Sequence, residues 1–392
     1  MSSVAPGRQP DMAASPFRPD RIDRLRSVLA AHTADGGGVP GLVWAVDRHG
    51  DTHVGAAGTF EPGGDRPVER DTIFRISSMS KPVTAVAALI LVEECRLRLD
   101  DPIDPFLPEL ADRQVMVDPA GSLTDTVPAN RPITLRDLLT FRMGIGMDFT
   151  VPFDQQPVLA RGAELELGAG PPAPAVPPAT DEWIRRLGTL PLAHQPGERW
   201  LYHVSADVLG VLVERASGQS FDGFLRERVF EPLGMADTGF SVPAGSLDRL
   251  GPLFVGGDPP VVYDPSDGQW SEPPAFCGGG AGLVSTVDDY LAFARMLRAG
   301  GGPILSRPTV DLMTTDHVGD PGWGFGVGVQ TTRTDVRSPG TYSWDGGLGT
   351  SWANDPVEGL IGVLMTNQMF MSPEPPAVVQ DFWTCAYAAL AT

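Results

Sequence analysis

The sequence predicts an α/β (α+β) fold in which one antiparallel sheet is built from both ends of the chain and flanked by helices. Residues 41–46 have an apolar strand pattern, and residues 48–51 turn the chain back into residues 52–58, which predicts a hairpin. Residues 360–366 form a second apolar strand pattern close to the C-terminus. Because most patterns between these strands are helical, we expect a mostly helical domain inserted into the sheet domain.

Helical periodicity accounts for much of the chain outside these strands. Residues 20–32 carry apolar side chains at helical spacing, and the run at residues 83–92 is apolar all round, which predicts a helix buried on all sides. Residues 134–137 have the pattern of a capping box and predict a short helix. Residues 323–329 alternate glycine with larger residues and predict a tightly approached strand. Further helices are predicted at residues 182–190, 204–216, 221–230, 288–298 and 378–390.

These elements divide the chain into two interleaved domains. The predicted sheet domain comprises residues 17–77 and 236–392, and the mostly helical domain comprises residues 78–235, with an active site between the two. Residues 1–16 have little to bury and predict a disordered tail. Residues 168–180 are mostly Gly, Ala and Pro, which indicates a linker or a surface excursion.

The composition limits the classes of partner. The chain has 392 residues, of which 42% are apolar and 20% are charged, as is ordinary for a globular protein. Its net charge of −20 argues against nucleic acid and against an anionic membrane as partners. We find no stretch apolar enough to span a membrane and no signal peptide pattern. We therefore expect a small-molecule substrate, no nucleic-acid or membrane partner and a cytoplasmic location, with the oligomeric state left open.

The cysteines and the common enzyme motifs indicate no cofactor. Cys95, Cys277 and Cys385 are odd in number and far apart, which favours small core residues in a reducing compartment over a disulfide or a metal site. The sequence has no His-Glu-x-x-His motif and no phosphate loop before its lysine. It also has no Gly-x-Ser-x-Gly motif, which argues against an α/β-hydrolase. We expect neither a metal nor a cofactor.

Lys81 is the only lysine in the chain, although lysine and arginine together number 29. Arginine keeps its proton in proteins, whereas a desolvated lysine can lose one. A single lysine, three residues after Ser78, therefore suggests a role that needs a titratable amine. The alternative is a surface lysine and a helix-capping serine, because Ser-x-x-Lys alone is a weak signal.

The position of Ser78 fits a catalytic role. Pro82 is tolerated only in the first turn of a helix, so the buried helix must begin close to Ser78. Residues i and i+3 share a helix face, which places the Lys81 amine beside the Ser78 hydroxyl. Backbone N–H groups at a helix start have no partner within the helix and favour negative charge. A serine there has a neighbouring base and half of an oxyanion site.

Three motifs occur in order along the chain, and the first has the Ser-x-x-Lys nucleophile pattern. They are Ser78-Met79-Ser80-Lys81, Tyr202-His203-Val204 and Trp344-Asp345-Gly346. Together they make the sequence similar to the serine β-lactamase and penicillin-binding-protein superfamily over residues 20–390. The closer likeness is to class C β-lactamases, which carry Tyr-x-Asn and Lys-Thr-Gly as the second and third motifs, and to family VIII carboxylesterases. The resemblance implies a β-lactamase-like fold.

The resemblance implies Ser78 as nucleophile, with Lys81 and Tyr202 sharing the task of general base. A neighbouring cation would lower the pKa of the tyrosine, which is about 10 when the residue is free. The backbone N–H groups of Ser78 and Gly347 would form the oxyanion hole, with Leu348 in place of Gly347 if the register slips by one.

Seven residues are expected to line the substrate pocket. Three follow from the third motif. Three belong to the segment 141–153, which is either an apolar wall beside the serine or an irregular core loop, and one is the histidine after Tyr202, which either tunes the site or lies at the surface. They are Trp344, Asp345, Gly346, Phe141, Met143, Phe149 and His203.

Two departures from the family pattern favour neutral substrates. The third motif has no lysine, and no arginine lies within residues 338–356 to replace the cation that the family associates with the substrate carboxylate. The second-motif asparagine, linked to the substrate amide, is Val204, and Trp344 adds apolar area. We expect a carboxylesterase that cleaves small neutral esters through an acyl-Ser78 intermediate. Hydrolysis of an amide, a β-lactam or a D-amino-acid peptide, acyl transfer, and a non-catalytic binding protein are the alternatives.

Overall fold

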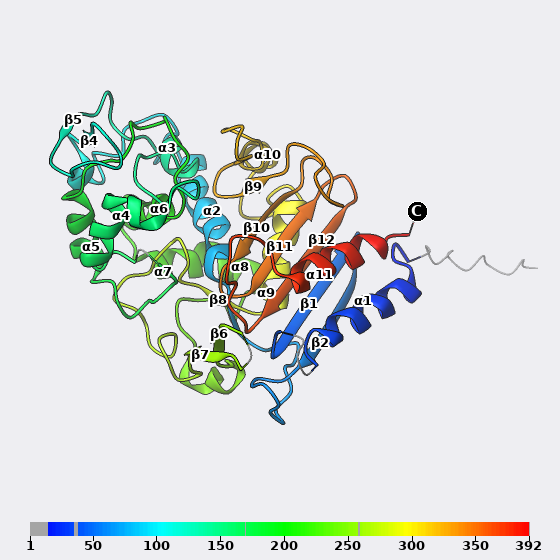
Figure 1. The fold of residues 1–392 in the computed structure, drawn as a ribbon. Helices are drawn as coiled ribbons and strands as arrows, with labels where there is room; N and C mark the ends of the chain where they lie inside the picture. Colours follow the sequence, from blue (N-terminus) through cyan, green and yellow to red (C-terminus); the bar gives the residue numbers. More distant parts are fainter. Residues whose placement is uncertain (1–14, 35–37, 169, 258, 392) are drawn as a thin grey trace, which may run out of the picture.

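The computed structural model describes residues 15–34, 38–168, 170–257 and 259–391, and the predicted disordered tail lies almost entirely outside these residues. A six-stranded antiparallel sheet has helices on both faces, and a mostly helical part packs beside it (Figure 1). The predicted fold class, including the β-lactamase-like architecture, is confirmed. No helix in the described part of the chain is long and apolar enough to cross a membrane.

Both ends of the chain build the sheet, as predicted. The N-terminal hairpin forms one side, and the last strand pairs with it from Leu42 opposite Thr366 to Arg48 opposite Leu360. In sheet order the strands are β2 (Asp51–Gly58), β1 (Gly41–Arg48), β12 (Leu360–Thr366), β11 (Thr350–Asp355), β10 (Tyr342–Gly346) and β9 (Gly328–Val329).

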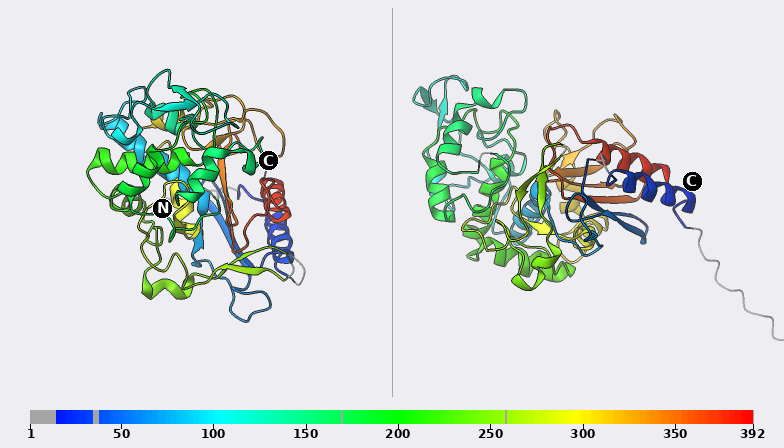
Figure 2. Two further views of the ribbon diagram at one scale, coloured as in Figure 1. Left: turned by 60° about the vertical axis from the view of Figure 1, so that its left-hand side comes forward. Right: turned by 60° about the horizontal axis from the view of Figure 1, so that its bottom comes forward.

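Side chains of β1 alternate between two apolar layers, as the two-residue period of a strand requires. Trp44 packs with α1 (Pro19–Ala31) and α11 (Ala377–Ala388), which lie side by side on one face of the sheet (Figures 1 and 2). Val43 points to the opposite face, where α9 (Val287–Arg298) covers β1, β11 and β12. The sheet is therefore buried on both faces. Its strands β10 and β11 contact residues 77–79, which lead into the helical part.

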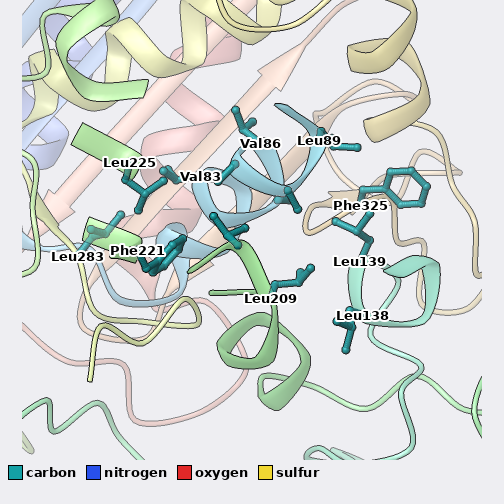
Figure 3. Close-up of a cluster of buried hydrophobic side chains, with 14 of the residues drawn as sticks. Val83, Val86, Leu89, Leu138, Leu139, Leu209, Phe221, Leu225, Leu283 and Phe325 are labelled. Atoms are coloured by element: carbon teal, nitrogen blue, oxygen red, sulfur yellow. The ribbon is translucent and has the colours of Figure 1, made fainter. Parts of the chain in front are cut away.

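Helix α2 (Ser80–Glu93) connects the sheet to the helical part. Residues 80–91 are all buried and Val92 is half-buried, which confirms the predicted burial on all sides for all but the last residue of the run. The helix packs against α6 (Val204–Ser217), and Figure 3 shows Val86, Leu209 and Phe325 from three segments in one cluster. Because burying one such side chain is worth about 1.5–3 kcal/mol, this cluster fixes the start of α2 relative to both parts of the protein.

The other elements are short. The predicted capping box is present at Thr134, whose side chain accepts the Asp137 N–H. The remaining helices are α3 (Leu135–Leu139), α4 (Pro157–Glu164), α5 (Thr180–Gly188), α7 (Phe221–Leu225), which a π-helical turn (Arg226–Phe230) extends, α8 (Glu231–Leu233) and α10 (Arg307–Met313). The minor strand pairs are β3 (Phe74–Arg75) with β8 (Val284–Ser285), β4 (Gln114–Met116) with β5 (Thr126–Pro128), and β6 (Leu253–Val255) with β7 (Val261–Asp264).

The predicted strand at residues 323–329 is wrong except for its last two residues, which form β9. The glycine alternation instead reflects close approach to α2, because a Cβ on Gly326 would lie 2.7 Å from the Cβ of Ala85. Gly326 also has a φ of 70° and donates its N–H to the Leu139 carbonyl, so its backbone leaves the strand ladder. Helices α4 and α10 and the hairpin of β6 and β7 are elements that the sequence patterns did not predict.

The prediction that Cys95 is a core residue is also wrong. Cys95 is exposed, with a φ of 58°, because α2 ends at Glu93 and the chain then turns away from the core. Cys277 is half-buried, and Cys385 is buried as predicted.

Candidate active site

Ser78 lies in a strained turn that leads into α2. It is the middle residue of the 3₁₀ helix Ser77–Met79, and Ser77 has a φ of 46°, which residues other than glycine rarely adopt. The Ser80 hydroxyl donates to the Ser77 carbonyl at 2.7 Å and accepts the Leu283 N–H at 3.1 Å. These bonds hold a conformation that the turn alone would not favour, as is typical of functional sites.

Strand β10 approaches this turn closely because residue 346 is glycine. A Cβ on Gly346 would lie 2.3 Å from the Ile76 carbonyl oxygen and 2.2 Å from Thr350 Oγ1, and Thr350 Oγ1 donates to the same carbonyl at 3.1 Å. The next residue, Gly347, consequently shares a cavity wall with Ser78. The backbone N–H groups of these two residues are the donors predicted for the oxyanion hole.

The Lys81 amine has three polar partners. Its Nζ lies 2.9 Å from Ser78 Oγ, 2.6 Å from the Gly280 carbonyl oxygen and 3.1 Å from His203 Nδ1. Burial lowers the pKa of Lys81 to about 7, against an opposing attraction from Asp207. Near neutral pH the amine is therefore present in both protonation states, whereas a lysine in water is almost fully charged.

His203 links this amine to a carboxylate. Its Nε2 lies 3.2 Å from Asp207 Oδ2 on α6, and Asp207 Oδ1 accepts the Gly280 N–H at 2.8 Å. With Lys81 donating to Nδ1, the ring hydrogen belongs on Nε2, where it faces Asp207. His203 holds this position with a φ of 83° and a ψ of −68°, the geometry of a strained γ-turn. The alternative of a surface histidine is therefore wrong.

Tyr202 lies over the amine and bonds to the third motif. Its ring centroid is 4.5 Å from Lys81 Nζ, and its hydroxyl accepts the Trp344 Nε1–H at 2.8 Å. Burial raises the pKa of Tyr202 well above that of free tyrosine, and contacts with Ser78 and Trp344 oppose this only in part. The predicted lowering of the tyrosine pKa is therefore wrong, because desolvation dominates and the neighbouring lysine is itself only partly charged.

A cavity of about 940 Å³ opens onto Ser78, and most of the predicted site residues line it. The segment 168–180 contributes to its wall through residue 168 and residues 170–172, and the Tyr263 hydroxyl anchors this segment by donating to the Pro172 carbonyl at 2.9 Å. The predicted residues on the wall are Ser78, Tyr202, His203, Phe149, Trp344, Asp345, Gly347 and Leu348.

Three predicted pocket residues do not line this cavity. Gly346 lies against Ile76, as described above. Phe141 and Met143 are fully buried at 0% exposure, and the Phe141 ring lies behind Tyr202 with a centroid distance of 6.1 Å. Phe141 therefore supports Tyr202 from behind, and Met143 is part of the main hydrophobic core.

Arg337 is a cavity residue that the sequence analysis missed, since it lies one position before the segment 338–356. Its Nη2 lies 2.6 Å from Asp335 Oδ2, and its Nε lies 3.0 Å from the same oxygen. The Asp345 carboxylate also acts on this guanidinium. Asp335 therefore pairs with the one cation that lines this cavity among the described residues, which leaves no excess positive charge to hold an anionic substrate.

Asp207 and Gly280 are further polar partners that the sequence analysis did not assign to the site. The spacing of His203 and Asp207, four residues apart at the start of a predicted helix, is a signal that could have paired them. Gly280 carries no such signal, because it contributes only backbone atoms.

Ser78 therefore lies beside a buried amine, one helical turn away, next to an antiparallel sheet, and a serine with a neighbouring base is the arrangement that serine hydrolases use. The chain belongs to the β-lactamase family, whose model matches residues 25–379. It is 32% identical to esterase EstB of Burkholderia gladioli over 371 residues, which cover 86% of this chain and 88% of that protein.

Two further comparisons extend the likeness. Protein Rv1367c of Mycobacterium tuberculosis is 39% identical over 321 residues, which cover 75% of this chain and 77% of that one. The solved structure of EstCE1, described as a hydrolase with promiscuous acyltransferase activity, superposes with a TM-score of 0.80 at 26% identity and covers 94% of this chain and 99% of that one. The family therefore includes both esterases and proteins with acyltransferase activity.

Proposed function

We propose that this protein is a carboxylesterase that cleaves neutral carboxylic esters through an acyl-Ser78 intermediate. The proposal is carried by the 2.9 Å contact between the Ser78 hydroxyl and the Lys81 amine, whose pKa is lowered to about 7. Such an amine can accept the serine proton at neutral pH, which an arginine or an exposed lysine cannot do. The similarity to an esterase along most of the chain supports the choice of an ester bond.

The contacts of Lys81 orient its lone pair. In the neutral amine, two N–H groups donate to the Gly280 carbonyl and to His203 Nδ1, which leaves the lone pair directed at Ser78 Oγ. Lys81 takes the hydroxyl proton as Ser78 Oγ bonds to the ester carbonyl carbon, and the oxyanion faces the N–H groups of Ser78 and Gly347. The C–O bond to the alcohol then breaks, and the proton passes to the departing oxygen. Water repeats these steps on acyl-Ser78 and releases the acid.

We assign Tyr202 to proton delivery and Lys81 to the primary general-base role. The raised pKa of Tyr202 keeps its hydroxyl protonated at neutral pH. The Trp344 N–H donates to the Tyr202 oxygen at 2.8 Å, and accepting a hydrogen bond strengthens a hydroxyl as a donor. Tyr202 is therefore suited to donate toward the leaving-group oxygen, and the proton that Lys81 took from Ser78 balances the one that Tyr202 gives up.

The charges around the cavity favour neutral substrates over β-lactams and peptides with a carboxylate. Trp344 stands where related β-lactamases have the lysine of the third motif, and Arg337 is paired with Asp335. Placing a carboxylate here would bring it close to an acidic side chain that already neutralises the arginine, which costs electrostatic free energy. Acyl transfer is the second candidate function, because a cavity of about 940 Å³ can hold an alcohol acceptor beside the acyl group.

The proposal is tested by assaying one preparation with p-nitrophenyl butyrate and with a chromogenic cephalosporin, each with and without an added alcohol. We expect rapid release of p-nitrophenol and slow or no opening of the cephalosporin. New ester formed from the added alcohol would identify acyl transfer. Rapid cephalosporin opening would contradict the preference for neutral esters, and no reaction with either substrate would contradict the enzyme assignment.

Replacing His203 with alanine is expected to lower kcat/KM by about 10²-fold, the loss that a misplacement of roughly 1 Å can produce. The Lys81 amine would lose the acceptor 3.1 Å away that orients its lone pair. His203→Asn is the matched control, because the Asn Oδ1 takes the place of Nδ1 as acceptor and asparagine tolerates positive φ. We expect it to recover most of the activity, with steady-state kinetics as the measurement. Equal losses in both variants would contradict this positioning role.

A further inference from the structure

The cavity at Ser78 continues into an apolar chamber within the helical part. Its walls come from α4, from α5 and from the segments that follow these helices, which lie together at the edge of the molecule in Figure 1. The side chains of these elements that define the chamber are buried, so the chamber is an internal extension of the active site. The residues that define it are Val158, Leu159, Leu167, Trp183, Leu187 and Leu190.

We infer that the natural substrate carries a large uncharged apolar group, on the acyl or the alcohol side of the ester, and that this chamber binds it. The inference rests on the proposed esterase function and revises the expected preference for small esters. A volume of about 940 Å³ lies near the upper end of the range of about 300–1,000 Å³ for sites that enclose drug-sized ligands. A short ester would leave most of this space to water against apolar walls.

Among the residues that the structure describes, the six that define the chamber offer no free polar group to anchor a charged or strongly polar substrate. Its six defining residues are aliphatic apart from Trp183, and the Trp183 Nε1–H donates to the Leu167 carbonyl at 3.3 Å. The charged residues of α4, Arg161 and Glu164, are exposed on the other side of the helix and pair with each other at 2.5 Å. Arg337 and Asp345 lie at the catalytic end of the cavity, on the sheet side. Transfer of an apolar group from water is the favourable interaction that such walls offer.

Gly162 keeps the chamber open. It lies within α4, where glycine is a poor helix former relative to alanine, and it is part of the cavity wall. A Cβ at this position would lie 3.9 Å from Leu190 Cδ1 and 4.0 Å from Leu167 Cδ1, which is ordinary van der Waals contact. The backbone therefore has no need for glycine here. The absence of a side chain instead preserves space between α4 and the two leucines.

Exposed apolar side chains mark the entrance to the cavity. Phe149 is 50% exposed, Phe153 is 44% exposed and Met371 is 69% exposed, and all three belong to the cavity wall. Clusters of exposed apolar residues around a cavity are typical of binding sites for apolar ligands. The exposed apolar residues and the chamber thus favour the same chemical property in a substrate.

The inference is tested with two series of substrates, p-nitrophenyl esters from acetate to dodecanoate and acetate esters of alcohols from ethanol to decanol. For wild type, we expect kcat/KM to rise in at least one series by about threefold to fourfold per methylene until the chamber is filled, the increment that burying a methylene provides. Gly162→Leu should cut the ratio of the long-chain to the acetate value in that series by about tenfold or more, because its side chain occupies the chamber. Gly162→Ala should give a smaller change of the same sign.

Ala163→Leu is the matched control, because it adds the same side chain to the exposed face of α4. It should leave the chain-length profile unchanged. The inference would be overturned if wild type preferred the shortest ester in both series, or if Gly162→Leu lowered kcat/KM for all esters equally. The absence of hydrolysis of any ester would instead refute the proposed function itself, so the two failures are distinguishable.

Discussion

Replacing Ser78 with alanine is expected to lower ester hydrolysis on the order of 10⁶-fold, because only binding and oxyanion groups then remain to assist water. The Ser78 hydroxyl is the group held 2.9 Å from the Lys81 amine, so the base has no nucleophile to activate in this variant. Release of p-nitrophenol measures the loss. Labelling with a fluorophosphonate, followed by mass spectrometry of the peptides, should place one adduct on Ser78 in wild type and none in the variant.

Ser205→Ala is the matched control for this substitution. Ser205 is a fully buried serine close to the site on α6, but its hydroxyl has no hydrogen-bond partner among the residues that the structure describes. Its removal should therefore affect neither stability nor activity by a large factor. If Ser78→Ala kept more than about a hundredth of the wild-type rate, far above the loss expected for a nucleophile, Ser78 could not be the nucleophile.

Elements made of a nearly continuous apolar run were predictable from the sequence. The strand expected at residues 360–366 is β12 (Leu360–Thr366), and the mostly apolar run at residues 83–92 lies within α2, which ends at Glu93. Such a run marks a buried element directly, and its length favours a strand in the first case and a helix in the second. Helix α4 was missed because it has only eight residues and contains Gly162, which interrupts its apolar pattern. The same glycine is explained once its position on the cavity wall is known.

In the candidate site, only contacts between residues close in the sequence were predictable. Ser78 and Lys81 are one helical turn apart, so their contact follows from helix spacing alone. The contact between Lys81 and His203 joins residues 122 positions apart, and it depends on a γ-turn that no sequence pattern indicates. Periodicity shows which face of a helix or strand is buried, but it does not show which distant residue a side chain on that face contacts.

The protonation states in the site were the least predictable property. The sequence placed a cation beside Tyr202, and a nearby cation by itself would lower the pKa of the tyrosine. The structure adds the burial of both side chains, which lowers the pKa of Lys81 to about 7 and raises that of Tyr202. Desolvation depends on all the segments that pack around a side chain in the folded protein. Here it raises the pKa of Tyr202, which is opposite to the expected direction. The division of labour between the two residues therefore follows from the fold.

Replacing Lys81 with arginine is expected to lower kcat/KM by about 10²–10⁴-fold, the usual contribution of a positioned general base, although the positive charge is kept. Arginine cannot release its proton at neutral pH and so cannot accept one from Ser78. In wild type, kcat/KM should rise with pH and level off above a midpoint near 7, because the neutral amine is the active form and burial lowers the Lys81 pKa to about 7. This rise should be absent from the pH profile of Lys81→Arg.

Two further variants separate the base role of Lys81 from a purely electrostatic role. Lys81→Met removes both the charge and the titratable amine, so it should lose as much activity as Lys81→Arg if proton transfer is what matters. Tyr202→Phe should be slower than wild type but should keep the midpoint near 7, because Lys81 and its pKa remain. If Lys81→Arg were far more active than Lys81→Met, the positive charge would be the important property. In that case another group, with Tyr202 as the first candidate, would have to take the Ser78 proton.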